Sequence, residues 1–357
     1  MATVERREQA PGKIRYRVRW WADGKQRSKT FARSDEARRF KAVLEGDHAN
    51  GSYRDPRSGA ETLATFVEGW LPTVVDLRPT TRARLESCLR THVLPEFGNL
   101  PLSGVTNAHV NLWVSTSLGK LSAASVRKNA FALRRVLEAA LDEGKIRVNP
   151  AAKLRLPAET KHEQHFLTKD EALRLADCID PRYRALVLLA VFGGLRFGEL
   201  TALKRDCLDV ARCTVRVRET LVDVNNTVHC GPPKTKSSLR TVTVPRSVMR
   251  ELQAHMLKYS ITESNQIIFT NEHGQPVRRA WWRKGTWLPA TKAAGLEGLR
   301  PHDLRHTFVA LWVMLGRNAK EVSKVAGHSS VAFTLDRYGH LYEVDDEGLA
   351  DRLDALI

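Results

Sequence analysis

Cysteine is scarce in this chain. Only five occur in 357 residues, they are widely scattered, and no two of them form a C-x-x-C pair. Disulfide frameworks and zinc sites need paired or closely spaced cysteines. The sequence therefore predicts neither feature at Cys88, Cys178, Cys207, Cys213 and Cys230. It also lacks a D-x-D motif, and we predict no metal ion and no other cofactor.

Long apolar runs are absent as well. A membrane span needs ~20 consecutive apolar residues, and no stretch approaches that length. The first residues, Met1 to Arg7, have no apolar core behind their charges, as a signal peptide would have. These absences predict a cytoplasmic protein without a membrane partner.

Acidic residues are outnumbered. The chain has 40 Asp and Glu against 57 Lys and Arg, which gives a formal net charge of +17. A cationic chain gains affinity for polyanions because it displaces counterions from phosphates. Nucleic acid is the first partner to consider and an anionic membrane the second. The chain is long enough for two or three domains.

Three segments with different periodicities predict an α+β fold that is predominantly helical. In the first, residues 1–58, an alternating apolar and basic run from Ile14 to Trp20 is typical of a strand with one buried face. A second strand from Gln26 to Phe31 and a helix from Ser34 to about Leu44 follow, and Gly46 to Gly59 is predicted as a linker. The basic residues of these strands either contact DNA in a groove or merely solvate an exposed sheet face: Arg15, Arg17, Arg19, Arg27 and Lys29.

The second segment, residues 62–157, is predicted to be all helical. A first helix presents Phe66 and Trp70 on one face, a second follows Thr80, and Pro95 to Leu102 is predicted as a turn. Two further helices complete the segment. The last of these helices has four basic residues largely opposite its apolar face: Arg127, Lys128, Arg134 and Arg135. These residues either form an ordinary solvated surface or clamp the DNA backbone.

The third segment, residues 161–357, contains the reactive side chains. A nearly all-apolar helix from Tyr183 to Phe192 ends at two glycines, and Arg196 then lies at the start of a new helix, where free N–H groups favour an anion. Arg196 is predicted to bind a phosphate. Glu199 lies on the same helix face and either holds this guanidinium or forms an ordinary surface pair with it.

Two alternating runs, Thr214 to Arg218 and Thr241 to Val244, flank a polar connection from Gly231 to Ser238. Together they predict a small antiparallel sheet with a basic hairpin. Lys234 on this hairpin could reach a phosphate, although a lysine at a hairpin tip is ordinarily solvent-facing.

The C-terminal run from Arg300 to His340 holds two further basic residues on one helix face, because His302 and Arg305 are three positions apart. An apolar stripe of Leu304, Phe308, Leu311 and Leu315 is predicted to fix this helix in the core. A second helix from about Ala319 to Ala326 precedes His328, and a third from about Ser330 ends at Tyr338. The final residues Leu349, Leu353 and Ile357 predict an amphipathic helix that docks on a neighbouring protomer or on its own domain.

Four boxes in this order resemble the tyrosine recombinase family, in its phage-integrase branch. They are Gly193 to Leu200, His302 to Thr307, Gly327 to Ser330, and Thr334 to His340. The two earlier segments resemble the helical core-binding domain and the small arm-type domain, a three-stranded sheet with a helix, of that family.

The resemblance implies roles for individual residues. Arg196, His302, Arg305 and His328 would bind or activate the scissile phosphate, with Tyr338 as the nucleophile. The catalytic lysine would be Lys234, with Lys236 as the alternative. A free tyrosine has a pKa of ~10 and needs a base, for which His302 is our candidate.

The resemblance also implies a function and partners. The protein would be a site-specific recombinase for integration or excision, working through a 3′-phosphotyrosyl intermediate and a Holliday junction without metal or ATP. Its partners would be core-type and arm-type DNA, three further protomers in a tetramer, and an accessory DNA-bending or directionality protein. The alternatives are a Xer-type resolvase, a type IB topoisomerase and a catalytically silent DNA-binding regulator.

Overall fold

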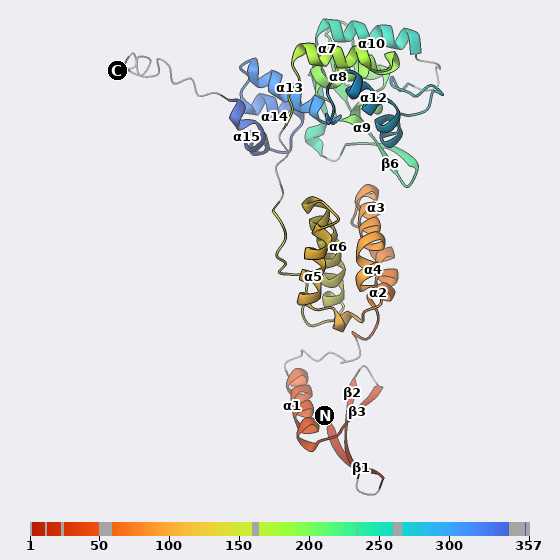
Figure 1. Ribbon diagram of the computed structural model, residues 1–357, viewed down its shortest axis with the longest axis vertical. Coiled ribbons are helices and arrows are strands. Elements are labelled where there is room, and N and C mark those ends of the chain that lie inside the picture. The colour runs from red at the N-terminus through yellow and green to blue at the C-terminus, as the bar shows by residue number, and fades with distance from the viewer. Residues whose placement is uncertain are drawn as a thin grey trace. The chain divides into compact units, whose positions relative to one another are not determined.

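A computed structural model describes residues 2–10, 13–22, 25–49, 59–158, 164–233, 235–259, 266–342 and 354. The chain divides into two compact units, Met1–Thr160 and Lys161–Ile357 (Figure 1). Helices predominate and the sheets are small and antiparallel, so the predicted α+β class is confirmed. Among the described residues, every helix is too short or too polar to span a lipid bilayer.

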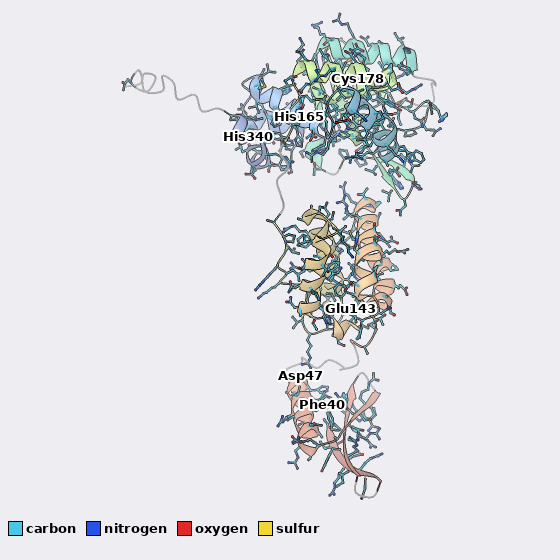
Figure 2. All side chains as sticks on the ribbon, in the orientation of Figure 1. Phe40, Asp47, Glu143, His165, Cys178 and His340 are labelled. Carbon is cyan, nitrogen blue, oxygen red and sulfur yellow. The ribbon has the colours of Figure 1, made fainter. Side chains whose placement is uncertain are left out.

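The first unit begins with a three-stranded antiparallel sheet and one helix. Strands β1 (Thr3–Ala10), β2 (Lys13–Ala22) and β3 (Lys25–Phe31) pair in the order β1-β2-β3. Helix α1 (Ser34–Ala49) covers one face, with Phe40 packed edge-on against Trp20 at 5.5 Å between ring centroids (Figure 2). The helix continues past its predicted end at Leu44 into the segment predicted as a linker, because Gly46 is accommodated in the helix interior at a modest cost.

The rest of the first unit is helical, as predicted. It contains α2 (Leu63–Trp70), α3 (Pro79–Cys88), α4 (Leu94–Phe97), α5 (Asn107–Leu118) and α6 (Ala123–Asp142). A π-helical turn, Leu89–Val93, joins α3 directly to α4. The predicted turn at Pro95 is therefore helical at its start, because proline in a first helical turn sacrifices no hydrogen bond.

The second unit is built around α8 (Arg184–Gly193), which is almost entirely buried. Against it pack α7 (Lys169–Cys178), α10 (Arg246–Tyr259) and α13 (Asp303–Met314). Helix α7 begins with a capping box, in which the side chains of Thr168 and Glu171 bond each other's backbone. The remaining helices are α9 (Phe197–Thr201), α11 (Arg279–Trp282), α12 (Leu288–Ala293), α14 (Ala319–Ala326) and α15 (Val331–Tyr338).

Two small sheets lie in this unit. Strands β4 (Leu208–Asp209), β5 (Thr214–Val217) and β8 (Arg240–Thr243) form one, so the predicted pairing of the two alternating runs is confirmed. The prediction of a single hairpin is wrong, because β6 (Thr220–Val224) and β7 (Thr227–Gly231) form a separate hairpin within the connection. Asn225 and Asn226, both with positive φ, make its two-residue turn. The polar segment after Gly231 therefore joins β7 to β8 and is not a hairpin tip.

The predicted apolar stripe of α13 is partly wrong. Leu304 and Phe308 are buried, but Leu315 is 74% exposed because the helix ends at Met314 and Gly316 (φ +73°) turns the chain away. The buried face instead includes Val309 and, beside it, the polar residues of the site. Helices α14 and α15 agree with their predicted bounds, whereas the predicted C-terminal helix lies outside the described residues apart from Asp354.

Candidate active site

Backbone carbonyls at two helix ends bring three of the four boxes together. Arg305 of α13 donates to two carbonyl oxygens. One belongs to Gly194, which directly follows α8, and the other to Ala326, the last residue of α14. Arg196 donates from Nη2 to the carbonyl of Gly327 at 2.8 Å. Both predicted arginines are thus fixed by helix C-termini, whose exposed carbonyls attract cations.

Two glycines make this close approach possible. Gly194 and Gly327 both have positive φ, +64° and +65°, and end their helices in the left-handed conformation. A side chain at Gly194 would overlap the Phe308 ring, and one at Gly327 would come within 2.9 Å of the Ser237 carbonyl. The glycines therefore allow the helix ends, α13 and the β7–β8 connection to meet at one place.

Glu199 is a buried anchor rather than a surface partner. Its side chain is 2% exposed, and its Oε1 accepts from Arg196 Nη1 at 2.8 Å while Oε2 accepts from the Arg196 backbone N–H at 2.9 Å. The prediction that Glu199 holds the Arg196 guanidinium remains the better of the two readings, because a buried charge must be paired.

Arg240 is a site residue that sequence reasoning missed. It lies on β8 with its side chain 5% exposed and donates to Glu199 Oε2 at 3.0 Å. It also donates to the carbonyls of Val325 at 2.8 Å and Ser238 at 3.2 Å. Arg240 therefore ties the first box, the β7–β8 connection and the end of α14 together. An arginine in an alternating strand next to a basic loop carries no sequence signal of burial.

The charges around Glu199 are unequal. Burial alone would raise the pKa of this carboxyl group, but the positive charges and hydrogen bonds of Arg240 and Arg196 outweigh burial and hold the pKa below its ordinary value. Burial, followed by the neighbouring charges of Arg196 and Arg240, lowers the pKa of Arg305. Arg196 and Arg240 thus both bond Glu199, and Arg305 lies within reach of its charge, so the excess positive charge of the three guanidinium groups suits a phosphate.

Tyr338 is buried within the same cluster. Its ring is 1% exposed and stacks on the His328 ring, with 6.0 Å between centroids and 4° between planes. His328 is held in turn by a 2.8 Å hydrogen bond between its Nδ1 and Thr334 Oγ1. Burial raises the pKa of Tyr338 to about 12, although the charges of Arg305 and Arg337 act in the opposite direction.

The hydroxyl of Tyr338 contacts His306, whereas our candidate base was His302. His306 Nδ1 lies 2.5 Å from the Tyr338 hydroxyl, and the His302 ring lies edge-on to His306 at 4.8 Å between centroids. His306 was visible in the second box, four residues and one helical turn after His302, but the resemblance assigned it no role.

All three histidines of the site are neutral at physiological pH. Burial, followed by the charges of Arg305 and Arg196, lowers the pKa of His302 to about 4 and that of His328 to about 3. Burial, followed by the charge of His302, lowers the pKa of His306 to about 3. His302 is nevertheless open to solvent on its outer side, whereas His306 and His328 are enclosed.

The two candidate lysines are described only in part. Lys234 lies outside the described residues, and of Lys236 only the backbone is described, in the short turn Lys236–Ser238. The hydroxyl of Ser238 lies 3.4 Å from Arg196 Nη1. The short turn Lys236–Ser238 therefore reaches the arginine cluster through Ser238.

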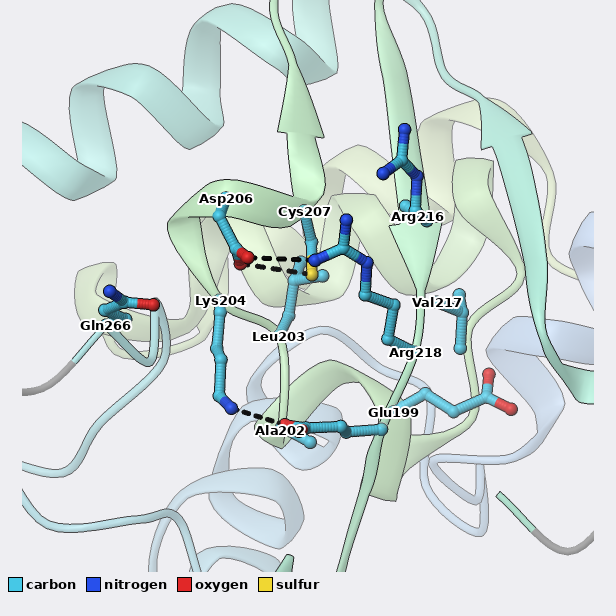
Figure 3. A pocket seen from close by; sticks show the side chains of 11 residues that line it. Glu199, Ala202, Leu203, Lys204, Asp206, Cys207, Arg216, Val217, Arg218 and Gln266 are labelled. Atoms are coloured by element: carbon cyan, nitrogen blue, oxygen red, sulfur yellow. Dashed lines mark hydrogen bonds and ion pairs between the residues drawn. The ribbon is translucent and has the colours of Figure 1, made fainter. Parts of the chain in front are cut away.

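A polar cavity of about 130 Å³ borders Glu199 on the side of β5 (Figure 3). Its charged groups bond each other, with Lys204 and Glu219 at 2.6 Å and Arg218 and Asp206 at 2.9 Å. In the part of the chain that the structure describes, no group of three or more His, Cys, Asp or Glu side chains is arranged to hold a metal ion.

The candidate DNA-binding residues of the small sheet fall on two faces. Val18 and Trp20 are buried, so the alternating Arg15, Arg17 and Arg19 lie on the face away from α1. Arg19 pairs with Glu5 at 2.8 Å, and Arg17 donates to Ser28 at 2.8 Å. The two cations of β3 do not extend this basic row, because they lie directly opposite Trp20 and Val18, on the helix-covered face: Arg27 and Lys29. Their contact with DNA stays a prediction.

The candidates on α6 also differ from one another. Arg127 donates to the Pro157 carbonyl at 3.0 Å, and Arg135 pairs with Asp76 at 2.7 Å. Both arginines thus have partners within their own unit. Lys128 and Arg134 are exposed on the polar side of the helix, as predicted.

Comparison with known proteins places this chain in a family. Residues 165–344 match the model of the phage integrase family, and residues 62–117 match that of the phage integrase N-terminal SAM-like domain. The phiRv2 prophage integrase of Mycobacterium tuberculosis is 29% identical, over 85% of this chain and 81% of that protein. The integrase of Mycobacterium phage L5 is 27% identical, over 84% of this chain and 80% of that one.

Solved structures share the fold. The Tn1549 transposon integrase in complex with transposon right end DNA has a TM-score of 0.69 at 19% identity, covering 83% of this chain and 100% of that one. The lambda integrase tetramer bound to a Holliday junction has a TM-score of 0.59 at 18% identity, covering 96% of this chain and 99% of that one.

The fold and the site together define a site-specific DNA recombinase of the tyrosine class. The chain belongs to the phage integrase family.

Proposed function

We propose that this protein integrates or excises a mobile DNA element by cleaving and rejoining DNA through Tyr338. The observation that carries the proposal is the convergence of Tyr338, His328, the buried Arg305 and the partly exposed Arg196 on one cluster with excess positive charge. A phosphodiester neutralises that excess. The intermediate is a 3′-phosphotyrosyl bond with a free 5′-hydroxyl.

Attack by Tyr338 forms the oxygen–phosphorus bond and breaks the bond to the 5′-oxygen. Arg196, Arg305 and His328 would stabilise the pentacoordinate phosphorane through fixed hydrogen bonds. Because guanidinium charges help depress the pKa of His302, a bound phosphate anion would raise it again. The binding of DNA thus makes His302 a better base. Because the Tyr338 hydroxyl contacts His306 and not His302, the tyrosyl proton would reach His302 by way of the His306 ring, which stays neutral.

The departing 5′-oxygen takes a proton from a lysine, for which we propose Lys234, with Lys236 as the alternative. General acid catalysis of this kind contributes ~10²- to 10⁴-fold in rate. Because the phosphotyrosyl bond conserves the energy of the phosphodiester, rejoining requires no ATP. No step requires a metal ion, since cationic side chains neutralise the phosphate.

The other parts of the chain would select and hold DNA. We propose that residues 1–58 bind arm-type sites, residues 62–157 bind core-type sites, and residues 161–357 catalyse. Four protomers would exchange strands through a Holliday junction, in the cytoplasm of a bacterial host and with a DNA-bending or directionality protein as a possible accessory. The lambda integrase tetramer bound to a Holliday junction supports this assembly by its similar fold.

A nicked suicide substrate tests the function. When cleavage releases a short strand, rejoining fails and the covalent intermediate accumulates. We expect wild-type protein to form, in EDTA and without ATP, an adduct in which the Tyr338 peptide carries a DNA 3′-phosphate. The absence of any adduct on DNA that the protein binds and protects in footprinting would contradict the proposal.

The arm-type role of the small sheet is tested by replacing Arg15, Arg17 and Arg19 with alanine. We expect binding to arm-type DNA to weaken by roughly tenfold or more and its salt dependence to flatten, since fewer phosphate contacts release fewer counterions. Suicide cleavage at the core site should stay within about twofold. A matched control is Arg27→Ala and Lys29→Ala on the helix-covered face, which should affect arm binding less. Equal loss at arm and core sites would refute the arm-type assignment.

A further inference from the structure

We propose that His306 is a positioning residue that orients the hydroxyl of Tyr338 for attack on the phosphate. This inference rests on the proposed nucleophilic role of Tyr338. It adds to the reaction a residue that lies outside the set of two arginines, two histidines and one lysine assigned above.

The contact is specific and enclosed. His306 Nδ1 and the Tyr338 hydroxyl are 2.5 Å apart, although the two residues are 32 positions apart in the chain and lie on α13 and α15. Both residues are buried, with exposures of 3% and 1%. A hydrogen bond in such a buried, low-dielectric site is stronger than one exposed to water. It therefore holds the direction of the Tyr338 hydroxyl more firmly than a hydrogen bond to solvent would.

The supports of His306 are equally rigid. It follows Arg305 on α13, and its backbone N–H donates to the carbonyl of His302 at 3.2 Å. On the other side, the Tyr338 ring is fixed by stacking on His328. The tyrosine ring and its hydroxyl are therefore held by different groups, and His306 governs only the hydroxyl.

The buried contact orients the Tyr338 hydroxyl and does not ionise it. Burial raises the pKa of Tyr338 to about 12 and lowers that of His306 to about 3, so in the resting site the proton stays on the tyrosine oxygen and His306 acts as the acceptor. His306 therefore remains neutral, with its proton on Nε2, and the Tyr338 hydroxyl donates to Nδ1. Of the groups that face His306, the side chains of His302, Arg337 and Arg300 oppose its protonation. Asp303 alone among them favours it.

The test compares two replacements of one residue. Asparagine can place its Oδ1 close to the position of Nδ1 and keeps an acceptor, whereas phenylalanine keeps a ring without one. On the nicked suicide substrate under single-turnover conditions, we expect H306F to form adduct ~10- to 100-fold more slowly, the range expected when a reacting group is misplaced. H306N should recover at least part of this loss, and both variants should bind core DNA with wild-type affinity.

The outcomes separate this inference from the proposed function. If wild-type protein forms no adduct, the proposed function fails. If wild type forms adduct and H306F matches its rate, or if H306N is as slow as H306F, orientation through an acceptor at Nδ1 is refuted. Should H306F fail to fold, H306Q replaces it. The amide of glutamine lies one bond farther from the backbone than that of asparagine, so H306Q is expected to form adduct more slowly than H306N.

Discussion

Tyr338→Phe protein is expected to form no covalent adduct with DNA while it still binds the core site. The substitution removes only the nucleophilic oxygen and keeps the ring that packs on His328. The lost hydrogen bond to His306 should change the free energy of unfolding by only ~1 kcal/mol. Denaturing gels of suicide-substrate reactions, together with gel-shift affinities, measure both effects.

Tyr342 offers the matched control. It lies four residues after Tyr338, and the same replacement there removes a hydroxyl that accepts or donates no hydrogen bond to a described group. Tyr342→Phe should therefore form adduct at close to the wild-type rate. An adduct that persists in Tyr338→Phe but disappears in Tyr342→Phe would show that Tyr342, and not Tyr338, is the nucleophile.

Glu199→Gln protein is expected to lose ~3–5 kcal/mol of the free energy of unfolding and most of its cleavage activity. The carboxylate is the shared partner of Arg196 and Arg240, and removing one member of a buried charge cluster leaves the remaining charges uncompensated. Arg196 would also lose the support that directs it toward the phosphate. Urea unfolding and single-turnover cleavage measure the two losses.

The same replacement at Glu251 is a control in the same unit. Glu251 is partly exposed and lies 3.6 Å from Arg184, a geometry in which ion pairs contribute ~0–1 kcal/mol. Glu251→Gln should leave cleavage unchanged. Equal losses of stability for both variants would show that Glu199 is not a specific anchor of the cluster.

Local signals account for most of the confirmed predictions. The glycine that ends α8, the bounds of α14 and α15, and the alternation in β2 each depend on residues within a few positions. Because caps and periodicity act over one or two turns, the sequence predicts these elements closely. Where a local signal was overlooked, as at Asn225 and Asn226, a whole hairpin was missed.

The faces of the small sheet show where local patterns become insufficient. Alternation in β3 places Arg27 and Lys29 on one face, but only the register with β2 shows that this face is the one that α1 covers. One residue of slip would exchange the two faces.

By itself, the sequence determined the family and the order of the helices that carry the four boxes, because these follow from short-range backbone preferences and from the boxes themselves. Tertiary structure alone decided which charges share a partner and which histidine contacts Tyr338. Glu199 meets Arg240 across 41 positions and His306 meets Tyr338 across 32. Such pairs form because burial forces each charge and hydroxyl to find a partner among distant segments, and that choice depends on how the helices pack.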